Sequence, residues 1–237
     1  MTLHEPSRRA NGQISCILFD LDGTLIDTTD LIYRSYQHAL TSVLGESMTR
    51  DELYIGYGQP LPEAFAAILA HRSVRLSDHE QSDLIDRLIV TYRAFNVAHH
   101  DALTREFPGV RSTLAELQRR GFALGLVTSK ARGIGERGLR LIGLDDRFDT
   151  TVFMEDSERH KPHPDPVWVA LHRLGYREQP SRALFVGDST HDVQAGRAAG
   201  TRTAGALWGP FPPGALAAEG PDYLLESVVD LLDLCAP

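Results

Sequence analysis

The 237-residue sequence has few cysteines, fewer cations than anions and no long apolar run. Its two cysteines, Cys16 and Cys235, do not make a disulfide framework, and we expect both to be reduced. Lys and Arg number 24 against 32 for Asp and Glu, so the net charge is −8, which disfavours a broad nucleic-acid surface because phosphate backbones need clustered cations. No stretch approaches the roughly 20 apolar residues of a membrane span, and the apolar run after Arg8 and Arg9 is too short for a secretory signal. We therefore expect a cytoplasmic protein that binds neither nucleic acid nor membranes.

What the composition does contain is typical of a folded globular protein. Hydrophobic residues make up 42% and charged residues 24% of the chain, which excludes disordered and collagen-like proteins. A chain of this length accommodates one large domain, or one domain that carries a smaller insert. We expect it to act as a monomer or a homodimer.

Five short apolar runs, well separated along the chain, predict the strands of a parallel sheet. Their hydrophobicity is nearly continuous, which is typical of strands buried on both faces. They span residues 14–19, 123–127, 150–153, 183–186 and 203–207. Segments of helical periodicity lie between them, at residues 110–120, 134–142, 166–174 and 193–199. Alternating strands and helices predict right-handed crossovers, and therefore a doubly wound α/β fold.

The stretch between the first two predicted strands is too long for an ordinary crossover. Three helical patterns occupy it, at residues 31–44, 62–69 and 77–95, and we find no convincing buried strand among them. We interpret it as an inserted helical cap domain, residues 29–101, on an α/β core that consists of residues 1–28 and 102–237. An insert that follows the first strand would lie over the carboxyl edge of the sheet, where open α/β folds bind ligands.

Two carboxylates follow the first predicted strand. Asp20 and Asp22 lie two residues apart on an extended segment and would therefore point the same way. A divalent cation, or a raised pKa of one carboxyl group, would relieve their mutual repulsion. Gly23 would let the backbone turn sharply and leave amides free to face an anion. Taken alone, this motif is equally compatible with an ordinary acidic turn.

The other predicted strands also end in polar residues. Thr128 and Ser129 follow the second strand, and Lys161 lies in a proline-stiffened loop after the third. Asp188 and Asp192 follow the fourth. Singly, such a threonine is often a helix cap and such a lysine a surface charge. Because the carboxyl ends of parallel strands meet at one edge of a sheet, we expect the set to form one site, with carboxylates for Mg²⁺ and donors for a phosphate.

With these motifs in this order, the sequence resembles the haloacid dehalogenase superfamily, and within it the helical-cap branch of phosphoglycolate phosphatase-like enzymes. The resemblance runs from about residue 14 to residue 234. It implies that Asp20 is the nucleophile and Asp22 the general acid and base. It also implies that Thr128 and Lys161 bind the transferring phosphoryl group.

The resemblance further implies a magnesium site. Asp20, the backbone carbonyl of Asp22, and Asp188 would hold Mg²⁺. Asp192 would support Lys161 or a metal-bound water.

Asp22 separates two reactions within this superfamily. A halide leaves without protonation, and the dehalogenase branch lacks an aspartate at this position. Asp22 therefore favours phosphoryl transfer over dehalogenation. For this reaction we expect Gly23 and Ser129 to bind phosphate together with Thr128 and Lys161.

We predict a Mg²⁺-dependent phosphatase that hydrolyses a small phosphorylated metabolite through an aspartyl-phosphate at Asp20. Residues 92–96 together with 99–101, and residues 128–132, are similar to stretches in the inorganic pyrophosphatases of the same branch, which makes pyrophosphate the alternative substrate. A phosphosugar mutase and a non-catalytic phosphate-binding protein are remoter alternatives. Specificity is expected in the cap, where Tyr57 and Gln59 lie in a turn between two predicted helices and either reach the leaving group or form a plain interhelical turn.

Two further motifs suggest other ligands, and we interpret both as structural. Gly133, Gly135 and Gly138 match a dinucleotide-binding pattern, but they begin too far after the preceding strand, and we expect a glycine-containing helix instead. His160 and His163 have no third ligand at a suitable spacing for a transition metal.

Overall fold

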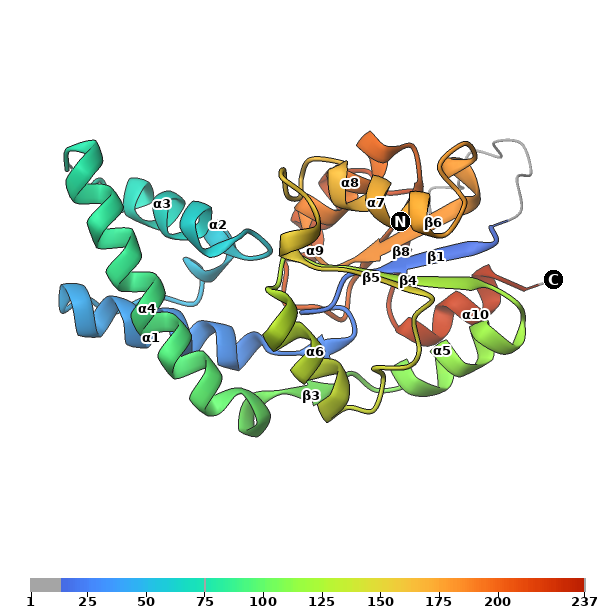
Figure 1. Ribbon diagram of the computed structural model, residues 1–237, viewed down its shortest axis with the longest axis horizontal. Coiled ribbons are helices and arrows are strands. Elements are labelled where there is room, and N and C mark those ends of the chain that lie inside the picture. The colour runs from blue at the N-terminus through green and yellow to red at the C-terminus, as the bar shows by residue number, and fades with distance from the viewer. Residues whose placement is uncertain (1–13, 75, 237) are drawn as a thin grey trace.

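A computed structural model describes residues 14–74 and 76–236 of the chain. Its centre is a six-stranded parallel sheet with the strand order β5-β4-β1-β6-β7-β8 (Figure 1). The strands are β1 (Cys16–Phe19), β4 (Ala123–Val127), β5 (Thr150–Val152), β6 (Ala183–Gly187), β7 (Arg202–Ala206) and β8 (Tyr223–Leu225). The strand order changes direction at β1, which confirms the predicted doubly wound α/β fold.

Helices cover both faces of this sheet. They are α5 (Val110–Arg119), α6 (Arg132–Leu141), α7 (Asp165–Arg173), α8 (Thr190–Ala199), α9 (Pro213–Ala218) and α10 (Leu231–Leu234), with 3₁₀ turns η1 (Met154–Asp156), η2 (Pro180–Arg182) and η3 (Val228–Asp230). In Figure 1, α7 and α8 lie above the sheet and α5, α6 and α10 below it. Ile17 and Phe19 of β1 pack into the lower apolar cluster, and Cys16 and Leu18 into the upper one. Alternate side chains are thus buried on opposite faces, which explains the continuous hydrophobicity of the strand.

Strand β8 lies outside the five predicted strands. It has three residues and forms one edge of the sheet. Tyr223 is half-buried and Leu224 is 44% exposed. A short edge strand of this kind is not buried on both faces, whereas burial on both faces was the basis for predicting the other strands.

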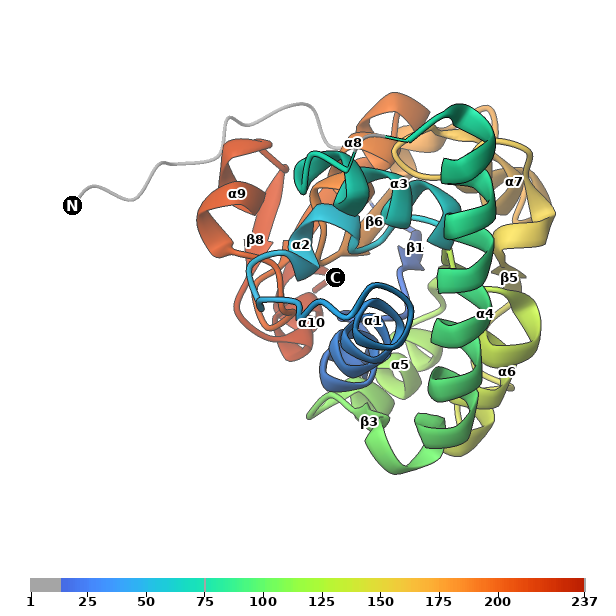
Figure 2. The same ribbon diagram turned by 90° about the vertical axis from the view of Figure 1, so that its left-hand side faces the viewer.

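Of the described helices between β1 and β4, the four that precede α5 share an apolar cluster of their own. They are α1 (Thr29–Leu44), α2 (Leu53–Gly56), α3 (Leu61–His71) and α4 (Asp78–Leu103). The ring of Tyr36 in α1 lies 5.1 Å from that of Phe65 in α3 and 4.8 Å from that of Tyr92 in α4, both edge to face. Figures 1 and 2 show these helices together at one end of the sheet, with α1 and α4 side by side. We call this unit the cap; its predicted boundaries, residues 29–101, remain a prediction.

Helix α4 continues to Leu103, beyond the predicted end at residue 95. At its start, Ser77 and Glu80 form a reciprocal capping box, which satisfies two backbone donors of the first turn. Near its end, the buried face of α4 carries the polar side chains of Asn96 and His100. Because these residues interrupt the apolar periodicity, the sequence pattern predicts an earlier end of the helix. Although α4 has 26 residues, neither it nor another described helix has the apolar character that a membrane crossing needs.

A short antiparallel ribbon joins the cap to the core. Its strands are β2 (Ile26–Asp27) and β3 (Arg105–Glu106), and Asp27 lies opposite Arg105. Helix α1 begins two residues after β2, and α4 ends two residues before β3. The chain therefore leaves the core and returns to it at neighbouring points. Strands of two residues carry no periodic signal, and the sequence did not predict them.

Candidate active site

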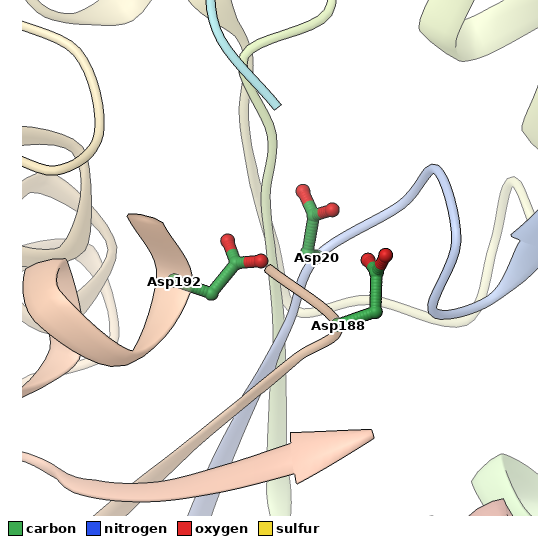
Figure 3. Close-up of side chains that lie close together, drawn as sticks. All are labelled: Asp20, Asp188 and Asp192. Atoms are coloured by element: carbon green, nitrogen blue, oxygen red, sulfur yellow. The ribbon is translucent and has the colours of Figure 1, made fainter. Parts of the chain in front are cut away.

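The strand register brings the polar ends of the central strands together. The last residue of β1 lies opposite residues near the ends of both β4 and β6. Asp20 follows β1, Thr128 follows β4 and Asp188 follows β6, so all three lie at one edge of the sheet. Figure 3 shows the carboxylates of Asp20, Asp188 and Asp192 grouped there, with Asp192 in the first turn of α8.

Lys161 lies between two of these carboxylates. Its ammonium donates to Oδ1 of Asp20 at 2.7 Å and to Oδ1 of Asp192 at 2.6 Å, and the residue is 3% exposed. Oδ2 of Asp192 accepts hydrogen bonds from the backbone amide and hydroxyl of Ser189. Asp192 is thereby fixed by the N-terminal turn of α8, and it holds the lysine against Asp20. The predicted association of Asp192 with Lys161 is present in this geometry.

Asp188 has one oxygen without a partner. Thr24 donates its hydroxyl to Oδ1 at 3.2 Å, whereas the fully buried Oδ2 has no hydrogen-bond partner among residues 14–74 and 76–236. Gly23 makes this close approach possible, because it has a φ of +84° and a Cβ there would lie 2.4 Å from the Asp188 carboxylate. The glycine predicted to bind phosphate thus also makes room for a carboxylate.

Burial and mutual repulsion raise the pKa of two of these carboxyl groups. Burial raises the pKa of Asp20 from 3.8 to about 7, Lys161 opposes this rise, and Asp192 adds to it. Burial, followed by the charges of Asp192 and Asp20, raises the pKa of Asp188 well above 3.8. In both groups burial therefore favours the protonated form, and a bound cation would favour the charged form instead.

The donor set fits a divalent cation with a preference for oxygen. Asp20, Asp188 and Asp192 each offer a carboxylate oxygen, and these atoms lie within 4.8 Å of one another. Both oxygens of Asp192 are already engaged by Lys161 and Ser189. Asp20 and the unpartnered Oδ2 of Asp188 are therefore the better carboxylate ligands, and hard oxygen donors of this kind suit Mg²⁺.

Asp22 is held by two donors that the sequence analysis did not assign to the site. Lys130 donates to Oδ1 of Asp22 at 2.6 Å, and the hydroxyl of Thr28 donates to the same oxygen at 2.6 Å. The Lys130 side chain is 10% exposed. Its position three residues after β4 is the signal that places it at the same edge of the sheet.

Thr128 and Ser129 lie in the turn after β4. The hydroxyl of Thr128 accepts a hydrogen bond from the backbone amide of Lys130 at 3.1 Å, and Ala131, not Thr128, is the N-cap of α6. The hydroxyl oxygen of Ser129 is buried and has no partner within the described chain. The turn therefore offers hydroxyl groups that α6 does not use for capping.

The core and the cap together enclose a cavity of about 330 Å³. The core side includes Asp20, Asp22 and Lys161. The cap side includes the turn between α2 and α3 and the middle of α4, from which Arg93 and Asn96 line the cavity. A cavity of this size suits a small ligand that is held between the two parts.

The turn between α2 and α3 brings Tyr57 and Gln59 to the core. Tyr57 is 2% exposed, its hydroxyl has no partner in the described structure, and its ring lies 6.3 Å from Phe211 in the loop after β7. Burial, followed by the charges of the site carboxylates, raises the pKa of Tyr57 well above 10. Gln59 lies with Nε2 at 3.5 Å from Nε2 of His191. His191 was not predicted as a site residue, because this contact exists only where the cap meets α8.

Of the two motifs interpreted as structural, the glycine motif lies in a helix and the histidine motif lies in a loop. Gly133, Gly135 and Gly138 all lie in α6, which confirms the predicted glycine-containing helix. A Cβ at Gly135 would lie 2.6 Å from the ring of Phe153, so this glycine permits close packing of α6 on the sheet. His160 precedes Lys161 in the loop between η1 and α7.

Comparison with known proteins gives a consistent set of similarities. Residues 17–206 match the family model of haloacid dehalogenase-like hydrolases. The chain is 43% identical to the pyrophosphatase PpaX of Bacillus velezensis over 94% of this chain and 96% of that protein, and 42% identical to PpaX of Anoxybacillus flavithermus over 93% and 96%. The structure of a haloacid dehalogenase-like hydrolase from Bacteroides fragilis matches with a TM-score of 0.82 and 27% identity, over 92% of this chain and 100% of that one. A predicted phosphoglycolate phosphatase from Haemophilus somnus shares the fold, with a TM-score of 0.81, 24% identity and coverage of 95% and 99%.

Proposed function

The chain belongs to the haloacid dehalogenase-like hydrolase family and is a phosphatase, and from this premise we propose that it hydrolyses inorganic pyrophosphate in a Mg²⁺-dependent reaction at Asp20. The observation that carries the proposal is the buried Asp20–Lys161 ion pair, which lines a small cavity between core and cap. Similarity to pyrophosphatases along nearly the whole chain supports pyrophosphate over an organic ester. This puts the alternative of the sequence analysis ahead of its first prediction.

The first step transfers a phosphoryl group to Asp20. A carboxylate oxygen forms a bond to one phosphorus, and the bond from that phosphorus to the bridging oxygen breaks, so that the second phosphate leaves with the electron pair. Lys161 lies at 2.7 Å from Asp20 and offsets the repulsion between a carboxylate and a phosphate. In the second step, water attacks the phosphorus of the aspartyl-phosphate, and orthophosphate leaves as Asp20 is restored.

Asp22 is proposed to move the protons of both steps. It gives a proton to the leaving oxygen in the first step and accepts one from the attacking water in the second. Lys130 and Thr28 both donate to Oδ1 of this carboxylate, which leaves Oδ2 for the exchange. These two contacts fix the orientation of the carboxyl group towards the cavity that it lines.

Asp20, Asp188 and the backbone carbonyl of Asp22 would hold Mg²⁺. The charge of the ion would draw the phosphoryl group towards Asp20 and would neutralise part of the negative charge of the carboxylates. We assign Gly23, Thr128 and Ser129, with Lys161, to the oxygens of the transferring phosphoryl group. The unpartnered hydroxyl of Ser129 supports this assignment.

A phosphate monoester of a small metabolite is the second candidate substrate. It is favoured by apolar side chains on the cap side of the cavity, which include Ile32, Leu61 and Val97. A leaving group with a carbon skeleton would contact this wall. In that case the steps at Asp20 and Asp22 are the same, and the leaving group alone differs.

The test is phosphate release with Mg²⁺ from pyrophosphate and from a panel of organic esters that includes p-nitrophenyl phosphate. We expect pyrophosphate to have the highest kcat/KM, and Asp20→Asn to lower turnover of every substrate by about 10³-fold or more, because it removes the nucleophile. Circular dichroism of the variant should match the wild type. Preference for one organic ester would establish the second candidate, and variant activity within about tenfold of wild type would contradict the role of Asp20.

A further inference from the structure

Arg93 is a cation of the cavity wall without a side-chain partner among the described residues. It lies on α4, is exposed, and lines the cavity between cap and core. It makes no ion pair and no hydrogen bond through its side chain within residues 14–74 and 76–236. Its neighbours Tyr92 and Asn96 also line the cavity but are buried, and Asn96 donates to the hydroxyl of Ser35 in the cap. Arg93 therefore has no role in the packing of the cap that these contacts reveal.

Lys130 supplies a second cation to the same cavity from the core side. Its ammonium binds Asp22 at 2.6 Å and is largely buried. An ammonium has three donor hydrogens, and this carboxylate takes one of them, so Lys130 keeps donors for a further anion. Lys161, in contrast, is engaged by two carboxylates, Asp20 and Asp192.

Charge balance shows why a second anion needs a cation from the cap. Four carboxylates at the site, Asp20, Asp22, Asp188 and Asp192, face two ammonium groups, those of Lys130 and Lys161. A bound divalent cation would bring this set to neutrality, with no positive charge in excess for a substrate that carries two phosphoryl groups. Arg93 provides that excess, and its planar guanidinium can donate two parallel hydrogen bonds to one phosphate.

Two hydroxyl groups give independent support for a polar ligand in this space. The hydroxyl oxygens of Tyr57 and Ser129 are buried, and neither has a partner in the described part of the chain. Both residues line the cavity. A buried hydroxyl without a hydrogen bond is unfavourable, so the phenol at the cap and the serine at the core are accounted for by a ligand that accepts hydrogen bonds from both sides.

We propose that Arg93 and Lys130 form a second anion site, which binds the leaving phosphate of pyrophosphate while Asp20 receives the other phosphoryl group. This inference rests on the proposed function and names the residues that select its substrate. Arg93 stabilises the negative charge that the leaving phosphate gains as the bridging bond breaks. A leaving group without an anionic phosphate gains little from Arg93.

The test compares Arg93→Gln and Arg93→Lys with the wild type on pyrophosphate and on p-nitrophenyl phosphate, both with Mg²⁺. For Arg93→Gln we expect the ratio of kcat/KM for pyrophosphate to that for the aryl ester to fall by about tenfold or more, since a charge-assisted hydrogen bond to the leaving group is lost. Arg93→Lys should recover part of this ratio. The control is Arg87→Gln on the same helix, because Arg87 is exposed and does not line the cavity.

A binding measurement separates this site from a general effect on catalysis. Calorimetry with imidodiphosphate, a pyrophosphate analogue that resists hydrolysis, should give a dissociation constant about tenfold higher for Arg93→Gln than for the wild type, both loaded with Mg²⁺. An unchanged selectivity ratio and an unchanged dissociation constant would overturn the site while the proposed function stands. Failure of the wild type to hydrolyse pyrophosphate would overturn the proposed function and this site with it.

Discussion

Asp20 is subject to opposing electrostatic influences from its immediate neighbours. Burial favours its neutral form, and Asp192 and Asp22 add repulsion, whereas Lys161 at 2.7 Å favours the charged form. Burial has the largest effect, so the pKa rises to about 7. The nucleophilic role that we propose for Asp20 requires an ionised carboxylate, and without a metal ion this ionisation opposes folding.

The metal-free protein should therefore lose stability as the pH rises from about 4 to about 7. In this window the folded state binds a proton at Asp20 and the unfolded state does not, because the folded pKa lies above 3.8. Urea denaturation in EDTA at several pH values measures the slope of the free energy of unfolding against pH. Asp20→Asn should reduce this slope, because the amide does not titrate, and the raised pKa of Asp188 should keep part of it.

The difference between wild type and Asp20→Asn isolates this contribution from that of the histidines. Burial lowers the pKa of His100 and His191, so these residues give a slope of the opposite sign around their own pKa values. Asp145→Asn, at an exposed carboxylate, is the matched control and should keep the wild-type slope. Identical slopes for wild type and Asp20→Asn would contradict the raised pKa.

At the scale of single residues, the sequence predicted which side chains strand register places at one edge of the sheet. Asp20, Thr128 and Asp188 each follow a strand of the same parallel sheet, so their meeting required no knowledge of side-chain conformations. The bond between Lys130 and Asp22 depends instead on the turn after β4 and on the conformation of a long side chain. Residue spacing does not determine either of these.

Among the elements, the turn between α2 and α3 brings the cap against α8, next to the carboxylates at the edge of the sheet. Gly58 has a φ of +79°, and a Cβ there would lie 3.3 Å from the hydroxyl of Ser189, which binds Asp192. Gln59 lies next to His191 on α8. Small changes in this turn should therefore be transmitted to the residues that hold Lys161.

Gly58→Ala should impair catalysis through this contact. A non-glycine residue at positive φ costs roughly 1–2 kcal/mol, and the added methyl group also pushes against Ser189. Gly45→Ala is the matched control, because Gly45 has a φ of +73° but nothing within 4 Å of its Cβ position. Both variants should lose similar stability in urea, and Gly58→Ala alone should lose several-fold in kcat/KM. Equal kinetics of the two variants would show that the turn does not act on the site.

The elements that apolar periodicity did not predict were missed for one physical reason. Apolar periodicity detects elements whose buried face is apolar and long enough to repeat. The last turns of α4 bury Asn96 and His100, and β2 and β3 have two residues each. Helix α6 was predicted despite its glycines, because Ile134, Leu139 and Ile142 keep the helical spacing.

Across the whole molecule, apolar side chains form clusters on each face of the sheet and within the cap, whereas buried charges concentrate where core and cap meet. The predicted doubly wound fold follows from the distribution of apolar side chains, which can be read directly from the sequence. The balance of buried charges follows from distances between strand ends, and composition does not show it. Stability of the whole chain should therefore respond to a cation at this junction.

Mg²⁺ should raise the melting temperature of the protein. A ligand present at 100 times its dissociation constant stabilises the folded state by about 2.7 kcal/mol, which corresponds to roughly 5–10 °C for a chain of this size. Differential scanning calorimetry in EDTA and in excess Mg²⁺ measures the shift. Asp188→Asn should melt higher than the wild type in EDTA, because a repelled carboxylate is removed, and should show little shift with Mg²⁺.

Asp145→Asn serves again as the control and should keep the full Mg²⁺ shift. A wild-type shift retained in Asp188→Asn would place the ion elsewhere. A wild type without any shift would contradict a magnesium site at these carboxylates.

The ribbon of β2 and β3 has a consequence for how such an enzyme can diversify. Because Asp27 lies opposite Arg105, the cap is attached to the core through two adjacent chain crossings. Replacement of everything between them by a different segment with similarly spaced ends would leave the strand order and the carboxylates of the sheet edge unchanged. Recombination at this ribbon would let a lineage exchange the cap wall of the cavity while it inherits the carboxylates of the sheet edge.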